Sequence, residues 1–126
     1  MAEEKPKNYI DFCGWGKIKI GTQEFDQAII SQGKAIRRQV EKLEEIFGTT
    51  HQIGEWEEKL LLAGNPEVII IGSGQFGVLK ISEEFKKKLE KSKAKVEVLL
   101  TPRAVSEFNR LVSEGKRVNA LIHTTC

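Results

Sequence analysis

The chain has 126 residues, of which 40% are hydrophobic, 20 are Lys or Arg and 18 are Asp or Glu, so its formal net charge is +2. This length predicts one domain, and a chain of this size buries roughly two thirds of its unfolded surface, enough to hold a core without a disulfide or a metal. Balanced charge argues against nucleic acid as a partner, because phosphate-dominated binding needs a clustered basic excess, and no apolar run approaches the ~20 residues that span a bilayer.

A β-hairpin is the first element that the pattern predicts. Residues 1–11 are largely charged or polar and are expected to form a flexible tail, which leaves 12–126 as the domain. Residues 15–20 alternate large apolar with polar side chains, Gly21-Thr22 breaks the alternation, and a second strand is expected over 25–30.

Residues 32–47 are compatible with two structures. Apolar side chains recur at helical spacing from Ile36 to Phe47, which favours a helix. Gln32-Gly33 is equally typical of a turn, with a third strand over 35–38. The pattern alone leaves both alternatives open.

Helices and strands alternate in the second half of the chain. A short helix around Trp56 is expected to end at Gly64-Asn65-Pro66, because proline cannot continue it. Residues 67–71 show no polar alternation, and the uninterrupted β-branched run within them, Val68 to Ile71, is typical of a strand covered on both faces, so this segment is predicted to be the central strand.

The elements that follow predict a largely parallel sheet. Ser82 is suited to cap a helix, and a strand is expected over 96–100. Thr101-Pro102 is typical of a second helix start, with Thr101 as the cap and Gly115 as the end, and a last strand is expected over 118–123. Strands that alternate with helices imply right-handed crossovers and helices packed on the sheet, so the fold class is α/β.

A glycine-rich loop, residues 72–77, directly follows the apolar strand and has the spacing of a dinucleotide-binding loop. However, residues 78–81 separate it from the next helix, and the following strand ends without the acidic residue that would bind a ribose. The favoured interpretation is therefore a glycine turn. Because ligands bind beyond the carboxyl ends of parallel strands, a small anion beside this loop and Thr101 stays a hypothesis.

The two cysteines and two histidines do not form a recognisable metal or catalytic motif. Cys13, His51, His123 and Cys126 lack the short ligand spacings of a structural zinc site, so we predict no metal and no cofactor. Without a disulfide framework, and with a start that is both acidic and basic, the chain is expected to be cytoplasmic.

Several segments together resemble a known family. In chain order they are Trp15-Gly16, Gly48-Thr49-Thr50-His51, Val68 to Gly74, Thr101-Pro102 with Ala104-Val105 and Phe108-Asn109, and Arg117-Val118 through His123-Thr124-Thr125-Cys126. The chain is similar to the small Mth-type domain family, which includes the adipogenesis-associated Mth domain-containing protein and a mitochondrial complex I assembly factor. The resemblance implies a single three-layer α/β domain with a mixed sheet, and a strand over 34–38 followed by an irregular or short helical segment.

The resemblance implies no reaction, since its members are associated with adipocyte differentiation or complex assembly. Our first hypothesis is thus a non-enzymatic domain that binds another protein. The second is a small-molecule or anion-binding protein, which could be an enzyme, with a site at the glycine loop. Its candidate ligand-binding residues are His51, Gly72, Ser73, Gly74, Gln75, Thr101 and His123.

Overall fold

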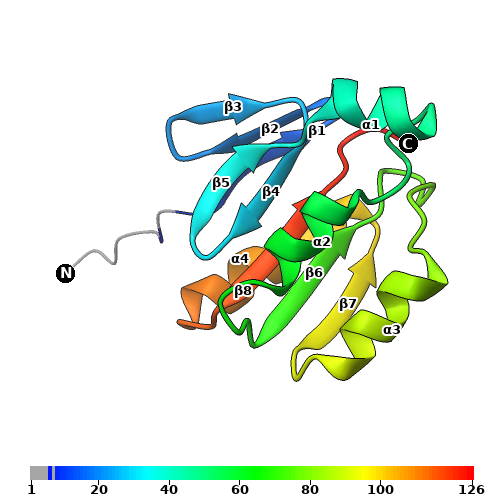
Figure 1. The fold of residues 1–126 in the computed structure, drawn as a ribbon. Helices are drawn as coiled ribbons and strands as arrows, with labels where there is room; N and C mark the ends of the chain where they lie inside the picture. The colour runs from blue at the N-terminus through cyan, green and yellow to red at the C-terminus, as the bar shows by residue number, and fades with distance from the viewer. Residues whose placement is uncertain (1–5, 7) are drawn as a thin grey trace.

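The computed structural model describes Pro6 and residues 8–126, and this part of the chain forms two sheets and four helices (Figure 1). The strands are β1 (Ile10–Gly14), β2 (Lys17–Ile20), β3 (Gln23–Phe25), β4 (Ala28–Ser31), β5 (Lys34–Arg37), β6 (Val68–Gly72), β7 (Lys95–Leu99) and β8 (Val118–Ile122). The helices are α1 (Val40–Phe47), α2 (Glu55–Leu62), α3 (Glu83–Lys91) and α4 (Thr101–Ser113).

The main sheet has five strands in the order β5-β4-β8-β6-β7. β6 pairs in parallel with both β7 and β8, whereas β4 pairs antiparallel with β8 and β5. The sheet is therefore mixed, as predicted. A second, three-stranded antiparallel sheet holds β1, β2 and β3.

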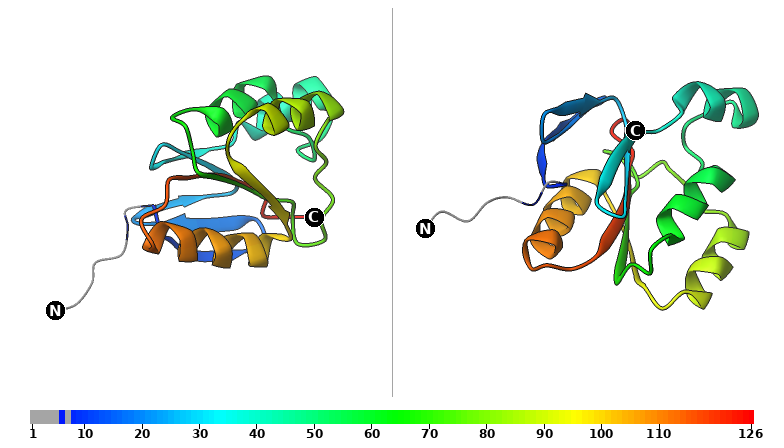
Figure 2. Two further views of the ribbon diagram at one scale, coloured as in Figure 1. Left: turned by 90° about the horizontal axis from the view of Figure 1, so that it is seen from below. Right: turned by 60° about the vertical axis from the view of Figure 1, so that its left-hand side comes forward.

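Three layers result, because both faces of the main sheet are covered. Helix α4 and the small sheet lie on one face, and α2 and α3 lie on the other (Figure 2). Along β6, Ile70 packs in the core with Phe108 of α4, whereas its neighbours Ile69 and Ile71 pack in the core with Phe85 of α3. Burial on both faces explains the uninterrupted apolar run of β6 and confirms the predicted α/β class.

The middle of the sheet is β8, and not β6 as predicted. All five residues of each strand are buried, so both strands are covered on both faces. Because the burial pattern is the same, the sequence pattern cannot distinguish the middle strand from the strand beside it.

The N-terminal hairpin exists in a shorter form than predicted. β2 pairs with β3, but the chain then leaves this sheet, and β4 joins the main sheet beside β8. β1 was not predicted as a strand. It starts inside the expected tail over 1–11, with Ile10 buried, while residues 1–5 and 7 lie outside the described residues.

Both structures considered for residues 32–47 occur in succession. Gln32 and Gly33 form a turn with positive φ, β5 follows, and α1 begins at Val40. This arrangement confirms the strand and short helix that the family resemblance implies.

Of the two helix starts predicted from a cap residue, one is confirmed and the other is wrong. Ser82 caps α3, since its Oγ accepts a hydrogen bond from the Phe85 amide at 3.1 Å. At α4 the prediction was wrong by one residue, because Leu100 occupies the cap position and Thr101 is the first helical residue. The Thr101 hydroxyl is used elsewhere, as described below.

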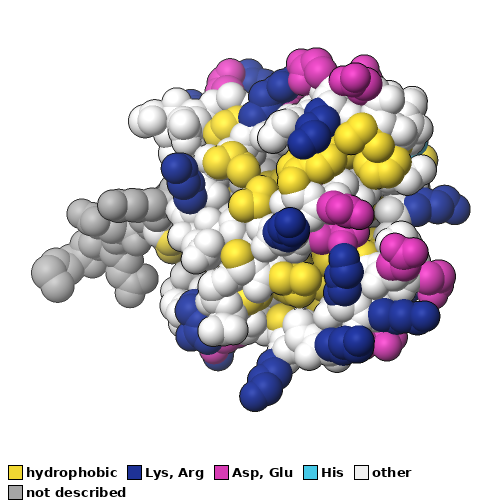
Figure 3. Space-filling model, viewed as in Figure 1, with side chains coloured by type: hydrophobic (Ala, Val, Ile, Leu, Met, Phe, Trp, Pro, Cys, Tyr) yellow, Lys and Arg dark blue, Asp and Glu magenta, His cyan; other side chains and the backbone are white. Residues whose placement is uncertain are grey.

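Charges of both signs are interspersed on the surface. Figure 3 shows Lys and Glu side chains alternating over α3, where Lys86 pairs with Glu83 at 3.1 Å and Lys88 with Glu58 at 2.9 Å. This is the mixed, solvated face typical of a surface helix. Within residues 6 and 8–126, no helix combines the length and apolar character needed to cross a bilayer.

Candidate functional site

All of the sequence-predicted ligand residues except His51 lie at the carboxyl ends of the parallel strands. Gly72 ends β6, the loop continues through Gln75, Thr101 follows β7, and His123 follows β8. His51 reaches the same place from the loop between α1 and α2, with its ring centroid 5.3 Å from that of His123 in an edge-on arrangement. The fold thus brings together residues that are far apart in the sequence.

Thr101 connects the glycine loop to the end of β8. Its hydroxyl accepts a hydrogen bond from the Gly74 amide at 2.9 Å and donates one to the His123 carbonyl at 2.6 Å. Its own amide donates to the Gly74 carbonyl at 3.0 Å, and the side chain has no exposed surface. Both hydrogen-bonding functions of the Thr101 hydroxyl are therefore used within the protein.

Most amides of the glycine loop, and that of Val78 after it, are also bonded within the protein. The Ser73 amide donates to Leu99 of β7, and the Gln75 amide donates to the Thr125 carbonyl at 2.7 Å. The amides of Phe76 and Val78 both donate to the main-chain oxygen of Cys126. An anion at this loop would have to replace these acceptors.

The polar side chains of the loop follow the same pattern. Ser73 Oγ donates to the Leu99 carbonyl at 3.1 Å, and Gln75 Nε2 donates to the Thr124 carbonyl at 3.2 Å. Residues 123–126 therefore lie against the loop, and a side chain at Gly74 would overlap the main chain of Cys126. The favoured glycine-turn interpretation has a steric basis here: Gly74 has a φ of +109°.

The His123 imidazole is completely buried and faces Gln27. Nδ1 lies 2.8 Å from Gln27 Oε1, which also accepts a hydrogen bond from Arg38 Nη1 at 2.7 Å. Because Arg38 can only donate, this amide oxygen is the acceptor for both, so the hydrogen-bond network assigns the proton to Nδ1 of His123. Nε2 then accepts from the Thr125 hydroxyl at 3.3 Å.

Burial lowers the pKa of His123 from 6.5 to about 4, and the neighbouring Arg38 and His51 act in the same direction. The imidazole is thus neutral at physiological pH. A neutral histidine can act as a base in principle, but here each ring nitrogen faces a partner within the protein.

Sequence reasoning missed the central charged pair of this network. Arg38 and Glu57 are both fully buried and form a bidentate ion pair, with Nε and Nη2 lying 2.7 and 2.8 Å from the two carboxylate oxygens. The other N–H groups of Arg38 donate to Gln27 and to the carbonyls of Thr50 and Gln52. Every guanidinium donor is therefore satisfied, which compensates for the burial of the charge.

A sequence signal for Glu57 exists, but it is incomplete. Its carboxylate also accepts a hydrogen bond from the Gly54 amide at 3.0 Å, which is the acidic half of a capping box at the start of α2. Gly54 has no side chain to supply the other half. The usual Ser/Thr-x-x-Glu pattern is consequently absent, and Glu57 looks like any surface glutamate.

His51 borders a cavity of about 300 Å³ beside the network. The His51 amide donates to Thr49 Oγ1, and its carbonyl accepts from the Lys80 amide at 2.8 Å, so the loop is fixed at the edge of the cavity. The residues that line it are Thr49, His51, Gln52, Ile53, Val78, Lys80, Ile81 and Ser82. His123 does not line it. Of the candidate ligand residues, only His51 does.

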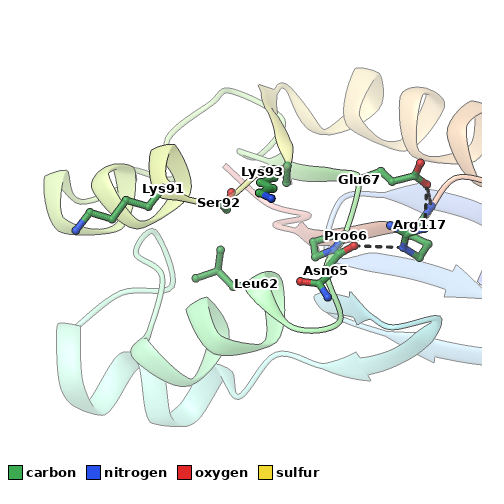
Figure 4. A pocket seen from close by; sticks show the side chains of 9 residues that line it. Leu62, Asn65, Pro66, Glu67, Lys91, Ser92, Lys93 and Arg117 are labelled. Atoms are coloured by element: carbon green, nitrogen blue, oxygen red, sulfur yellow. Dashed lines mark hydrogen bonds and ion pairs between the residues drawn. The ribbon is translucent and has the colours of Figure 1, made fainter.

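Another cavity, of about 600 Å³, lies at the opposite end of the sheet (Figure 4). Two of its charged side chains are engaged: Glu67 Oε2 accepts a hydrogen bond from the Arg117 amide at 2.8 Å, and the Arg117 guanidinium donates to the Asn65 carbonyl at 3.2 Å. In Figure 4 the Lys91 side chain points away from the other labelled residues. None of the predicted ligand residues lines this cavity.

No metal site is found in the part of the chain that the structure describes, since no three His, Cys, Asp or Glu side chains are grouped there in a way that could hold an ion. Both cysteines, Cys13 and Cys126, are free thiols.

Comparison with known proteins identifies similar chains over nearly the full length. Residues 10–123 match a family described as "Protein of unknown function (DUF498/DUF598)". The conserved hypothetical protein PH1505 from Pyrococcus horikoshii OT3 is 31% identical, with a TM-score of 0.78 over 93% of this chain and 98% of that one. A solved structure named MT938 is 33% identical, with a TM-score of 0.71 over 93% and 97% of the two chains.

Two other similar proteins carry informative names. A Bordetella pertussis protein called a Mth938-like domain is 17% identical with a TM-score of 0.68, over 98% of this chain and 90% of that one, and it shares the fold. The "13 kDa major membrane protein" of Francisella tularensis subsp. holarctica is 25% identical over 124 residues, 97% of each chain. The Mth-type resemblance derived from the sequence is thereby confirmed.

Proposed function

We propose, from the surface of the molecule, that this chain, which belongs to the DUF498/DUF598 family of proteins of unknown function, is a non-enzymatic domain that binds another protein. The observation that supports this best is a pair of exposed aromatic side chains, Trp15 and Phe76, which are 59% and 75% exposed with ring centroids 6.0 Å apart. Large aromatic side chains in water are typical of protein contact surfaces.

The two aromatic residues come from different parts of the chain. Trp15 lies in the turn between β1 and β2, and Phe76 lies in the glycine loop. Leu100, which is 49% exposed, lies beside the same loop. The Cδ2 atom of Leu100 would be 3.0 Å from a Cβ atom added at Gly77. We call the surface formed by the aromatic residues Trp15 and Phe76, together with the neighbouring Leu100, the aromatic patch.

The hydrogen bonds beneath the patch give it a rigid base. The Phe76 amide is bonded to Cys126, and the Gly16 amide, next to Trp15, donates to the Thr124 carbonyl at 3.3 Å. Both aromatic residues are thus attached to residues 123–126. The two loops that carry the rings are thus already ordered, so a partner that packs an apolar side chain over the rings would lose little entropy in ordering these loops, which favours binding.

The buried polar network supports a structural role for the candidate ligand residues. His123, Thr101 and the loop amides are bonded to one another or to Gln27 and the chain after β8. In the proposed function this network holds the glycine loop, and with it Phe76, in position.

We also propose a cytoplasmic location. The free thiols of Cys13 and Cys126 suit a reducing compartment, and burial raises the pKa of the Cys13 thiol to about 11, which makes it unreactive. The name of the Francisella relative refers to a membrane. Adsorption of the aromatic patch to lipid is therefore an outcome that the experiment must distinguish.

The experiment compares Trp15→Ala and Phe76→Ala with Ile46→Ala, a matched control that removes a 55% exposed hydrophobic side chain from α1. Proteins retained from host lysate by the wild type are purified, and their affinities are measured by calorimetry. We expect both patch variants to bind at least about tenfold more weakly and the control to bind normally. Equal affinity of all variants, or patch-dependent binding only to anionic lipid vesicles, would overturn the proposal.

A second candidate is a small anion in the cavity beside His51. This cavity is lined by His51 and Lys80, and none of the ion pairs among the described residues involves Lys80. A thermal-shift screen with inorganic phosphate and nucleotides tests it, because a ligand that prefers the native state must raise the melting temperature. A shift that disappears in His51→Ala supports the site, and unchanged melting with every compound excludes these anions.

A further inference from the structure

Strand β7 forms one edge of the main sheet, and its outer side has no strand neighbour within residues 6 and 8–126. The Lys95 amide donates to the Glu67 carbonyl, and the Leu99 carbonyl accepts from the Ser73 amide, both at 2.9 Å. Because main-chain groups alternate in direction along a strand, Val96 and Val98 direct their N–H and C=O groups outward. These groups are available to another strand.

An apolar groove runs beside this edge, between β7 and α3. Its volume is about 360 Å³, and it is lined by Ile81, Lys86, Leu89, Glu90, Ser92, Ala94, Val96 and Val98. Val98 is 48% exposed. Edge strands are usually protected by prolines, bulges or charges that discourage pairing, and β7 has neither a proline nor a bulge in its register with β6.

We propose that β7 pairs antiparallel with β7 of a second copy of this chain, with the two-fold axis at Val96. The argument is the self-complementary sequence Ala94-Lys95-Val96-Glu97-Val98. In this register Lys95 of each copy lies opposite Glu97 of the other, and Val96 lies opposite its equivalent. The charged pairs lie on the α4 side of the sheet and the valines on the groove side.

Main-chain geometry favours the same register. Two opposed residues in an antiparallel pair direct their main-chain groups either both toward the partner strand or both away from it, so even-numbered residues of β7 must face even-numbered residues. The two nearest registers that meet this condition place Lys95 opposite Lys95, or Glu97 opposite Glu97. Like charges directly opposite are destabilising, so the register centred on Val96 is preferred.

The helix beside the groove is self-complementary in the same way. Lys86 and Glu90 both line the groove and are one helical turn apart on α3. A two-fold axis reverses the direction of the second α3, which brings Lys86 of one copy toward Glu90 of the other. The groove would then be closed by the apolar side chains of both copies.

Charge-reversal variants of the full chain test the register. In Glu97→Lys, each copy has two lysines at the contact, and in Lys95→Glu each has two glutamates, so both variants should be monomers. Mixed together, they restore two Lys–Glu pairs and should form a heterodimer. Lys87→Glu makes the same charge change as Lys95→Glu, but on α3 and at a residue that does not line the groove; it is the matched control and should dimerise like the wild type.

Sedimentation equilibrium at about 10 µM to 1 mM protein gives the readout, with a monomer of 14.2 kDa. Folding is checked by thermal melts, because Glu107 of α4 lies near both Lys95 and Glu97. Glu97→Lys brings a cation to Glu107 and should remain stable. A wild type that stays monomeric throughout, a Glu97→Lys variant that dimerises like the wild type, or a folded mixture without heterodimer would each overturn the proposal.

Discussion

Arg38 and Glu57 form a bidentate ion pair in which neither side chain has any exposed surface. The pair joins the end of β5 to the start of α2. Arg38 is also connected to His123, because both side chains hydrogen-bond to Gln27 Oε1. The described residues contain no buried side-chain nitrogen or oxygen without a hydrogen-bond partner. Glu57, Arg38, Gln27 and His123 form one connected chain of hydrogen bonds, and removal of any of these side chains leaves another without its partner.

Glu57→Gln should lower the free energy of unfolding by about 3–5 kcal/mol, because it leaves the Arg38 charge buried and uncompensated. Urea denaturation followed by circular dichroism measures this change. In a double-mutant cycle, Arg38→Met with Glu57→Leu should cost clearly less than the sum of the two single changes. Additive losses would mean that the two side chains do not stabilise each other.

Stability should fall between pH 6.5 and pH 4 because of His123. Its pKa is about 4 in the folded protein and 6.5 in the unfolded chain, so the unfolded state binds more protons in this range. The contribution is fully present above pH 6.5 and amounts to at most about 3 kcal/mol. Unfolding free energies of the wild type should therefore decrease on acidification more steeply than those of His123→Gln, and parallel curves would contradict the assignment.

Thr101→Val should destabilise the protein by about 2–3 kcal/mol, because the Gly74 amide and the His123 carbonyl both lose a buried hydrogen bond. Thr101→Ser is the control, since it keeps the hydroxyl. Denaturation curves give the energies, and hydrogen exchange at the Gly74 amide gives a local readout. If Val and Ser at this position were equally stable, the hydroxyl would not be what holds the loop.

Gly74→Ala should cost about 3 kcal/mol or more, because it adds backbone strain at a φ of +109° to overlap with the main chain of Cys126. Gly33→Ala is the matched control, since Gly33 also has a positive φ but no atom within 4 Å of the added Cβ. That variant should lose only about 1 kcal/mol. Thermal melts that rank the two variants equally would show that crowding at Gly74 is unimportant.

The sequence predicted the features that depend on residues close together in the chain, such as helix caps and buried strands. Ser82 caps α3 because a cap bonds an amide only three residues away, and residues 68–71 form a strand because burial on both faces requires such a run. The same capping rule gave a wrong prediction for Thr101, which is not the cap of α4. Its side chain fits a cap, but partners 27 and 22 residues away in the sequence use its hydroxyl.

The interior network could not be predicted from the pattern. Arg38 follows a strand with exposed ends, and nothing local indicates that it is buried with Glu57, 19 residues further on. Ile10 is the one buried residue of β1, so this strand lacks the alternation of apolar and polar residues from which a strand is predicted. The ligand site at residues 72–75 stays a prediction, although its residues do come together with Thr101 and His123.

The position of β8 also affects when the domain can fold during synthesis. β8 lies between β4 and β6, so the first half of the sheet and the β6-β7 pair have no hydrogen-bonded ladder with each other until it is in place. On the ribosome, residues 10–117 would emerge with two sheet halves whose facing edges are open. Completion of the sheet must therefore wait until residues 118–122 have left the exit tunnel, and until then both edges are exposed to chaperones and to neighbouring nascent chains.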